Sequence, residues 1–268
     1  PYHEAEFLEE SLFIVPGSDE KYPDTDFQPP SRIVLLGSDY MGRDTLSRIL
    51  FGARTTIGIS FIATILAYLI GVTLGIAAAV GYRFQYRGFT IIELDTVLSR
   101  LNDALLSIPS IMLGLVMIAA LGSTIPLLIF LTGIIYAASV FRIARSLGQE
   151  VMVSDFVEAA RVRGEGLWWI ITREILPNVA MPLATDFGLR FVWVILFISA
   201  LSFLGLGVQP PMSDWGSMVK ENLPGLIYGS VAPLIPSLAI ATLTISVNMI
   251  VDDISAQTGG KLAKRMIS

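Results

Sequence analysis

Six mildly polar side chains inside otherwise apolar stretches are the first candidates for chemistry in this sequence. They are Asn102, Asp103, Ser107, Ser110, Ser202 and Asn248. A carboxylate inside a membrane costs about 2.5 to 3.5 kcal/mol on insertion scales, so one that persists usually faces a cavity or a partner. For Asp103 two interpretations stay open, the lining of a solute path and a packed or interfacial helix end. These six groups can offer hydrogen bonds to a passing solute, but their pattern does not indicate which solute.

The sequence shows none of the residue patterns that carry hydrolysis or metal catalysis. It has no cysteine, and its single histidine, His3, lies in an acidic N-terminal segment. Gly259, Gly260 and Lys261 are followed by Leu262, so the rest of a phosphate-binding loop is missing. Neither an H-E-x-x-H nor a G-x-S-x-G pattern occurs. We therefore predict a chain that is not an enzyme, has no metal or cofactor of its own and binds no nucleic acid.

The elements that position the polar residues are predicted to be membrane helices. Hydrophobic residues make up 53% of the chain and charged residues 15%, which is too apolar for an ordinary soluble fold. Five membrane spans are predicted, at residues 55–82, 94–121, 126–141, from about 190 to 206, and 232–251.

Two patterns inside these spans predict helix contacts. Gly71, Gly75 and Ala79 are four residues apart and form a stripe on which another helix can pack closely. Asp186 and Arg190 are also four apart, so they are expected to pair on one helix face and to stabilise a helix end.

A polar stretch that begins at Asp155 predicts a helical hairpin at a membrane face. Glu158 stands three residues after Asp155, which predicts a capping box at the start of the first helix. Gly164 supplies the left-handed residue that ends this helix. A second helix is expected to run to Leu176, where Pro177 stops it.

The spacing of this hairpin resembles the EAA loop of ABC-importer permeases, which docks onto a cytoplasmic ATPase. Its glutamate, two alanines, turn glycine and final Leu-Pro are all present, although the usually apolar position two before the leucine is Glu174. The resemblance implies the following coupling residues: Glu158, Ala159, Ala160, Arg161, Gly164, Leu176 and Pro177.

Two further stretches are similar to the C-type permeases of dipeptide, oligopeptide and nickel importers. One is residues 34–54, where Asp44 is expected to cap a helix that starts at Thr45, and the other is residues 201–218. The resemblance implies an all-α integral membrane protein with the type I ABC importer permease fold. The implied parts are an extracytoplasmic acidic segment with an interfacial helix (1–54), a transmembrane domain (55–268), a cytoplasmic coupling loop (148–185) and an extracytoplasmic loop (207–231).

The charged connections predict which side of the membrane each loop faces. The basic residues fall in the turn with Arg83 and Arg87, in the hairpin and in the C-terminal tail, and these three connections lie on one side by parity. The positive-inside rule makes that side cytoplasmic. Residues 1–54, which hold the whole net charge of −5, are then extracytoplasmic, and a sixth span is expected upstream of Pro1. The localisation expected is the cytoplasmic (inner) membrane of a bacterium or archaeon, with a cytoplasmic C-terminus.

The resemblance also implies the partners of this chain. They are a second permease subunit in a heterodimer, two ABC ATPase subunits that bind ATP and Mg, an extracytoplasmic substrate-binding protein, and membrane lipid. Family members carry dipeptides, oligopeptides, nickel chelates, peptide antibiotics and some sugar conjugates. Two alternatives stay open, a secondary transporter or channel that needs no ATPase, and an exporter or scaffold component.

Overall fold

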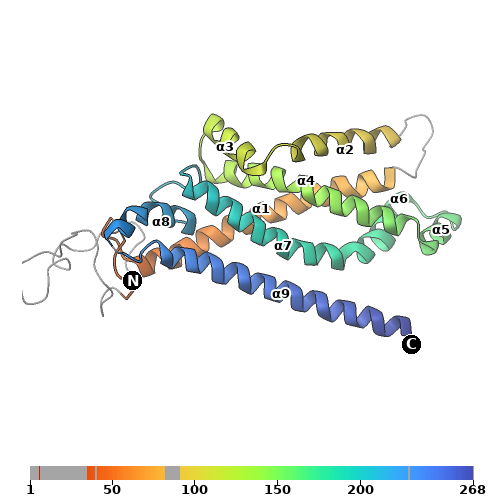
Figure 1. Ribbon diagram of the computed structural model, residues 1–268. Helices are drawn as coiled ribbons and strands as arrows, with labels where there is room; N and C mark the ends of the chain where they lie inside the picture. The colour runs from red at the N-terminus through yellow and green to blue at the C-terminus, as the bar shows by residue number, and fades with distance from the viewer. Residues whose placement is uncertain (1–5, 7–34, 40, 82–90, 229, 268) are drawn as a thin grey trace, which may run out of the picture. The chain divides into compact units, whose positions relative to one another are not determined.

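The computed structural model describes residues 6, 35–39, 41–81, 91–228 and 230–267. The long elements within these residues are helices (Figure 1). Its α-helices are α1 (Thr45–Gly81), α2 (Ile91–Leu106), α3 (Ser110–Leu121), α4 (Ile125–Met152), α5 (Asp155–Val162), α6 (Leu167–Trp169), α7 (Leu176–Phe203), α8 (Trp215–Asn222) and α9 (Leu234–Ile267). A π-helix, η2 (Ile170–Ile175), and a 3₁₀ helix, η3 (Leu223–Tyr228), complete them. Most of the acidic segment (1–5 and 7–34) and the predicted basic turn with Arg83 and Arg87 lie outside the described residues.

Four described helical stretches are long and apolar enough to cross a membrane: Thr45–Gly81, Ile125–Met152, Leu167–Phe203 and Leu234–Ala256. Asp95–Leu106 and Ser110–Leu121 meet the same criteria together, but they are bent by 85° relative to each other. Counted as one broken span, this pair is the fifth. The predicted all-α membrane architecture is confirmed, whereas the stretch 94–121 is not one straight helix.

Pro109 explains where the second predicted span breaks. Its ring disfavours the helical conformation for Ile108, and it has no N–H with which to continue α2. The backbone N–H of Ser107 still donates to the carbonyl of Asp103 at 3.0 Å, which closes the last turn of α2. The N–H of Leu113 donates to the carbonyl of Pro109 at 3.1 Å, so a new helix begins there.

The first membrane helix begins at Thr45, as Asp44 predicted. The Asp44 carboxylate accepts the backbone N–H of Ser47 at 3.0 Å, which satisfies one of the free donors at the helix start. The helix continues without a break to Gly81. The interfacial helix expected within residues 1–54 is therefore the first part of the membrane helix.

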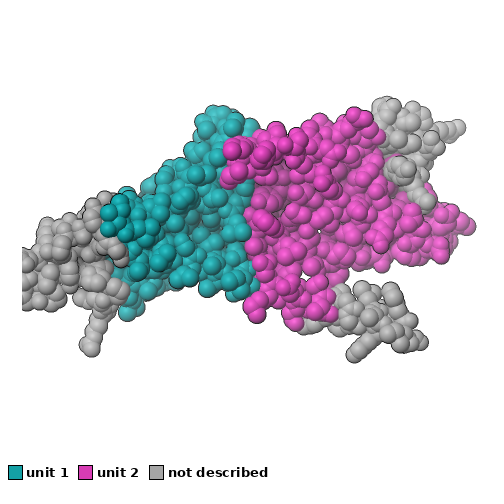
Figure 2. Space-filling view, in the orientation of Figure 1, with its two compact units in different colours: residues 1–61, 115–128, 195–246 teal, residues 62–114, 129–194, 247–268 magenta. Residues whose placement is uncertain are grey.

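The chain forms two compact units (Figure 2). Unit 1 comprises residues 1–61, 115–128 and 195–246, and unit 2 comprises residues 62–114, 129–194 and 247–268. Because α1, α3, α4, α7 and α9 cross these limits, each of them contributes residues to both units.

In unit 2, α1 and α4 approach each other at backbone distance through small residues. A methyl group added at Gly71 would lie 2.8 Å from a backbone carbonyl oxygen of α4, and one at Gly75 would lie 2.7 Å from another. One added at Gly148 of α4 would lie 2.8 Å from the Cβ of Ala79. The predicted small-residue stripe is therefore confirmed, and its partner is α4.

Candidate functional site

Helix α5 is the first arm of the predicted hairpin, but its start differs from the prediction. The N-cap residue is Ser154, and it makes no side-chain capping hydrogen bond. The predicted capping box was wrong, because Asp155 is already the first helical residue. Asp155 and Glu158 instead lie in the first turn of α5, where negative charge interacts favourably with the helix dipole.

Gly164 ends α5 in the way that its residue type predicted. Its φ is +82°, a left-handed conformation that costs glycine little. The N–H of Gly164 donates to the carbonyl of Arg161 at 2.9 Å, and the N–H of Glu165 donates to that of Ala160 at 3.1 Å. This pair of hydrogen bonds is the Schellman motif, which satisfies the last carbonyl groups of a helix.

The second arm does not end at Pro177, so this part of the prediction was wrong. Helix α6, the π-helix η2 and α7 form one helical stretch from Leu167 to Phe203. Pro177 is the second residue of α7, and its missing N–H leaves the carbonyl of Arg173 without its usual helical partner. The π-helical turn η2 directly precedes α7, and the helix continues through it past Pro177.

A buried apolar core holds the two arms of the hairpin together. Val157 and Ala160 on one face of α5 are fully buried, and they cluster with Ile170 and Ile175 of η2. Residues from the ends of α1, α4 and α7 complete the cluster: Ile76, Val80, Ala144, Met152, Val179 and Leu183. Because Ala160 lies inside this core, its small side chain lets the two arms approach each other. The hairpin is thus anchored on three membrane helices of unit 2.

The outer side of the hairpin exposes large apolar side chains. Val162 is 83% exposed and Trp168 is 76% exposed, and Val153, Phe156 and Leu167 are also exposed. Of the residues predicted to couple to an ATPase, the exposed ones are Glu158, Ala159, Gly164 and Pro177, and the half-buried ones are Arg161 and Leu176. An apolar surface presented on an anchored hairpin is typical of a protein-docking site.

Arg163 connects the hairpin turn to the second arm. Its guanidinium carbon lies 5.9 Å from the ring centroid of Trp169, within the range of a cation–π contact. Its Nε lies 3.9 Å from a carboxylate oxygen of Glu165. The hairpin surface therefore combines exposed apolar groups with charges of both signs.

Four of the six polar residues predicted to line a solute path lie near the α2–α3 bend. Asn102 is buried, whereas Asp103, Ser107 and Ser110 are exposed. Asp103 pairs with Arg142 of α4 at 3.2 Å, and both side chains are largely exposed. The structure thus brings these four together on one bent element of unit 2, and their role in a path stays a prediction.

The other two predicted path residues lie elsewhere. Asn248 is half-buried in the last part of α9 that belongs to unit 2. Ser202 is buried in unit 1, where its hydroxyl accepts the backbone N–H of Val208 at 3.3 Å. That hydrogen bond stabilises the irregular backbone after α7.

Comparison with known proteins identifies the family of this chain. Residues 71–256 match the family described as binding-protein-dependent transport system inner membrane component. The chain belongs to this family.

The relatives of this permease are named as transport permeases. It is 36% identical over 226 residues to a protein of Brucella suis biovar 1 assigned as a peptide transport system permease, covering 84% of this chain and 73% of that protein. It is 31% identical over 252 residues to the glutathione transport system permease protein GsiD of Pectobacterium atrosepticum, covering 93% and 81%. A solved structure of the MetNI methionine ABC transporter aligns with a TM-score of 0.62 at 16% identity, covering 77% of this chain and 94% of that chain. This likeness confirms the ABC importer permease fold.

The permease also contains an ion pair that the sequence analysis missed. Arg145 of α4 donates to both carboxylate oxygens of Asp95 in α2, at 2.6 and 2.7 Å. Two parallel hydrogen bonds of this kind are stronger and more directional than a single contact. The two residues are 50 positions apart, so no local pattern could predict their contact.

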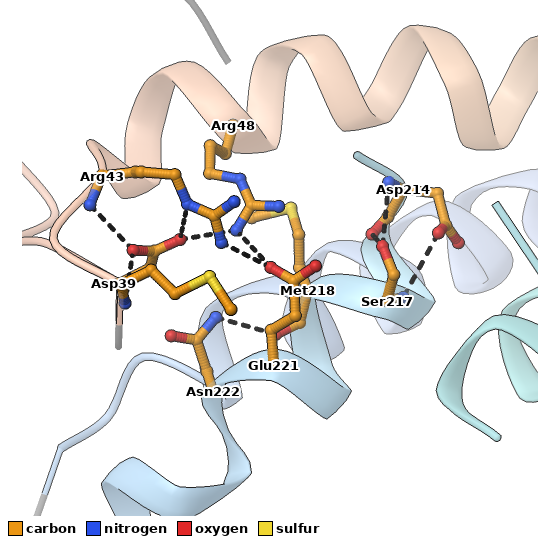
Figure 3. Close-up of polar contacts among 9 residues, drawn as sticks. Asp39, Arg43, Arg48, Asp214, Ser217, Met218, Glu221 and Asn222 are labelled. Atoms are coloured by element: carbon orange, nitrogen blue, oxygen red, sulfur yellow. Dashed lines mark hydrogen bonds and ion pairs between the residues drawn. The ribbon is translucent and has the colours of Figure 1, made fainter. Parts of the chain in front are cut away.

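In unit 1, four charged side chains of the permease form a closed network (Figure 3). Arg43 donates to Asp39 at 2.8 Å and to Glu221 of α8 at 2.6 Å. Arg48 donates to the same two carboxylates, at 2.5 and 2.8 Å. Each arginine thus contacts both acids, and two positive charges balance two negative ones. The network attaches the chain before α1, and α1 itself, to α8.

The start of α8 contains another buried carboxylate. Asp214 caps the helix, because its carboxylate accepts the backbone N–H groups of Gly216 at 3.1 Å and Ser217 at 3.3 Å. The Ser217 hydroxyl accepts the backbone N–H of Asp214 in return, which completes a capping box. Burial raises the pKa of the Asp214 carboxyl above its ordinary value, against the opposing effect of these hydrogen bonds and one from Ser202. The pattern Asp214 followed three residues later by serine was a local signal for this cap that the sequence analysis did not use.

The predicted pair of Asp186 and Arg190 is confirmed, with Arg190 Nε 3.3 Å from the carboxylate. Its expected position was wrong, because both residues lie near the middle of α7 and not at a helix end. The sequence-based prediction placed the start of a helix close to Asp186, because Pro177 was expected to end the preceding helix.

Proposed function

We propose that this permease is the membrane subunit of an ATP-driven importer of short peptides. The observation that carries the proposal is the exposed apolar side of a hairpin whose other side is anchored in the core of three membrane helices. Such a surface can receive force from a docked ATPase and transmit it to the helices. The names of the relatives, which include peptide, glutathione and dipeptide transport permeases, support peptides as the substrate class.

The partners follow from this assignment. A second permease completes the path, two ATPase subunits bind ATP and Mg, and a substrate-binding protein delivers the peptide from outside. This chain supplies no catalytic group. The hairpin and the C-terminus face the cytoplasm, and residues 1–54 face the outside, as the positive-inside rule favours. ATP-driven approach of the ATPases moves the hairpin, and the rigid helices rock between inward-open and outward-open arrangements.

Purification of the complex tests this function directly. The tagged permease, extracted in detergent from cells that express its neighbouring genes, is expected to retain a second permease and an ATPase, with ATP hydrolysis stimulated by the peptide-loaded binding protein. Trp168→Ala should weaken ATPase retention at least tenfold, because tryptophan is enriched among the interface residues that contribute about 2 kcal/mol or more, on the order of thirtyfold in affinity. Trp193→Ala is the matched control, since Trp193 is also exposed but lies in α7 outside the hairpin.

Two results would contradict the proposal. A homo-oligomer without an ATPase would favour the secondary transporter, and full ATPase retention by the Trp168 variant would remove the hairpin surface as the docking site.

Gly164→Val is expected to uncouple ATP hydrolysis from transport. A β-branched residue strongly disfavours the φ of +82° found at Gly164, so the Schellman turn must rearrange. No other group lies within 4 Å of an added methyl there, so the damage should stay in the hairpin. Peptide uptake by reconstituted vesicles should fall at least tenfold while the membrane helices stay inserted.

Gly166→Val is the control, since an added methyl is equally unhindered there and the φ of Gly166 is −73°. Normal uptake by the Gly164 variant would exclude this role.

A further inference from the structure

In unit 2, the membrane helices α1, α4 and α7 bring polar side chains together well away from the helix ends. Arg190 lies 14 residues after the first residue of α7 and 13 before the last. At 1.5 Å per residue it is about 20 Å from either end. Tyr68 of α1 and Tyr136 of α4 also lie well inside their helices. A charged residue at this depth is a candidate functional site.

The contacts within this cluster orient Arg190. The Asp186 carboxylate accepts hydrogen bonds from the Tyr68 hydroxyl and from Arg190 Nε, the latter at 3.3 Å. The Phe187 ring packs edge-on against Tyr68 with centroids 5.0 Å apart. The Tyr136 hydroxyl donates to the backbone carbonyl of Trp193, which lies three residues after Arg190 on α7, at 3.1 Å. Asp186 therefore acts as a positioning residue that holds the guanidinium in place.

Arg190 keeps part of its binding capacity unused. Its contact with Asp186 uses Nε, and among the described residues neither terminal nitrogen, Nη1 or Nη2, has a hydrogen-bond partner. The side chain is 22% exposed. An arginine inside a membrane almost always faces a protein interior or a water-filled path. Lipid headgroups begin about 15 Å from the midplane, so they are poorly placed to supply an anion here.

We propose that Arg190 binds the carboxylate of the peptide during its passage through the membrane. The planar fork of a guanidinium matches a carboxylate, and the two terminal nitrogens are the ones available. Asp186 already balances the charge of Arg190, and a peptide with a free ammonium and a free carboxylate adds no net charge to the cluster. This inference rests on the proposed function and names the group of the substrate that the path recognises.

Equilibrium binding to the purified permease complex, without the binding protein, tests the inference. The probes are radiolabelled trialanine with a free carboxylate and its C-terminal amide. The wild-type complex should bind the free acid at least tenfold more tightly than the amide. Arg190→Gln should remove this preference, and Arg190→Lys, which keeps the charge but loses the fork, should lower it at least threefold.

Each other outcome overturns the inference. Absence of trialanine binding, equal binding of acid and amide by the wild type, or a preference that survives in Arg190→Gln would exclude a carboxylate subsite at Arg190. If the Gln variant does not assemble, an unchanged preference in the Lys variant has the same meaning. Retention of the ATPases and ATP hydrolysis are measured on the same samples. If the complex hydrolyses ATP and transports peptide but shows no such preference, the carboxylate subsite is excluded and the proposed function stands.

Discussion

Arg48→Met is expected to lower the free energy of unfolding by about 3 to 5 kcal/mol, the cost of removing one partner from a buried ion network. Arg48 is 1% exposed, and it donates to Asp39 and Glu221 at 2.5 and 2.8 Å. Without it, Arg43 alone faces the buried carboxylate of Asp39 and the half-buried one of Glu221, so one negative charge stays unbalanced. Unfolding of the purified permease in mixed micelles, followed by circular dichroism during a titration with denaturing detergent, measures the loss.

Arg142→Met is the matched control for this prediction. Arg142 also pairs with an aspartate, Asp103, at 3.2 Å, but the two side chains are 64% and 68% exposed. Exposed pairs contribute about 0 to 1 kcal/mol, so this variant should unfold almost as the wild type does. If both variants lost the same free energy of unfolding, burial of the network around Arg48 would not determine how much the network contributes to stability.

Gly75→Leu is expected to destabilise the permease by about 3 kcal/mol, at the upper end of typical overpacking costs. The first side-chain carbon would lie 2.7 Å from a backbone carbonyl oxygen of α4 and 2.8 Å from the Cβ of Ala144. Neither atom can move unless the backbone shifts, so α1 and α4 must separate. The amount of folded protein in the membrane and its thermal unfolding temperature in detergent report this loss.

Gly58→Leu controls for the effect of leucine on helix formation. Gly58 lies on the same helix, and an added Cβ would meet no atom within 4 Å. Because leucine favours a helix more than glycine does, this variant should be as stable as the wild type or slightly more so. Destabilisation of both variants to the same degree would contradict close packing as the cause.

Features that depend on local chemistry could be predicted from the amino-acid sequence alone. Apolar composition predicted the spans, since a run of about 20 apolar residues is stable inside a bilayer whatever its neighbours are. Asp44 predicted the start of α1, and Gly164 predicted the end of α5, because capping and positive φ involve residues within one helical turn. The spacing of Gly71 and Gly75 predicted a close helix contact, although it did not indicate that α4 makes it.

Predictions from short sequence patterns failed where the same pattern was compatible with two different local structures. Pro177 was expected to end a helix, but the helix continues through a π-helical turn into α7. The EAA spacing did not show that Ala160 is buried between the two arms while Ala159 is exposed, because that depends on where η2 packs. Asp155 matched a capping pattern, yet the helix began at Asp155 itself.

The polar contacts between residues far apart in the sequence became known only from the tertiary structure. Arg48 and Glu221 are 173 residues apart, Tyr68 and Asp186 are 118 apart, and Arg145 and Asp95 are 50 apart. A charged residue in an apolar sequence indicates that some partner must exist, since burying it alone is costly. Which residue is the partner depends on how the helices pack in three dimensions, and the spacing of charges along the chain carries no record of that packing.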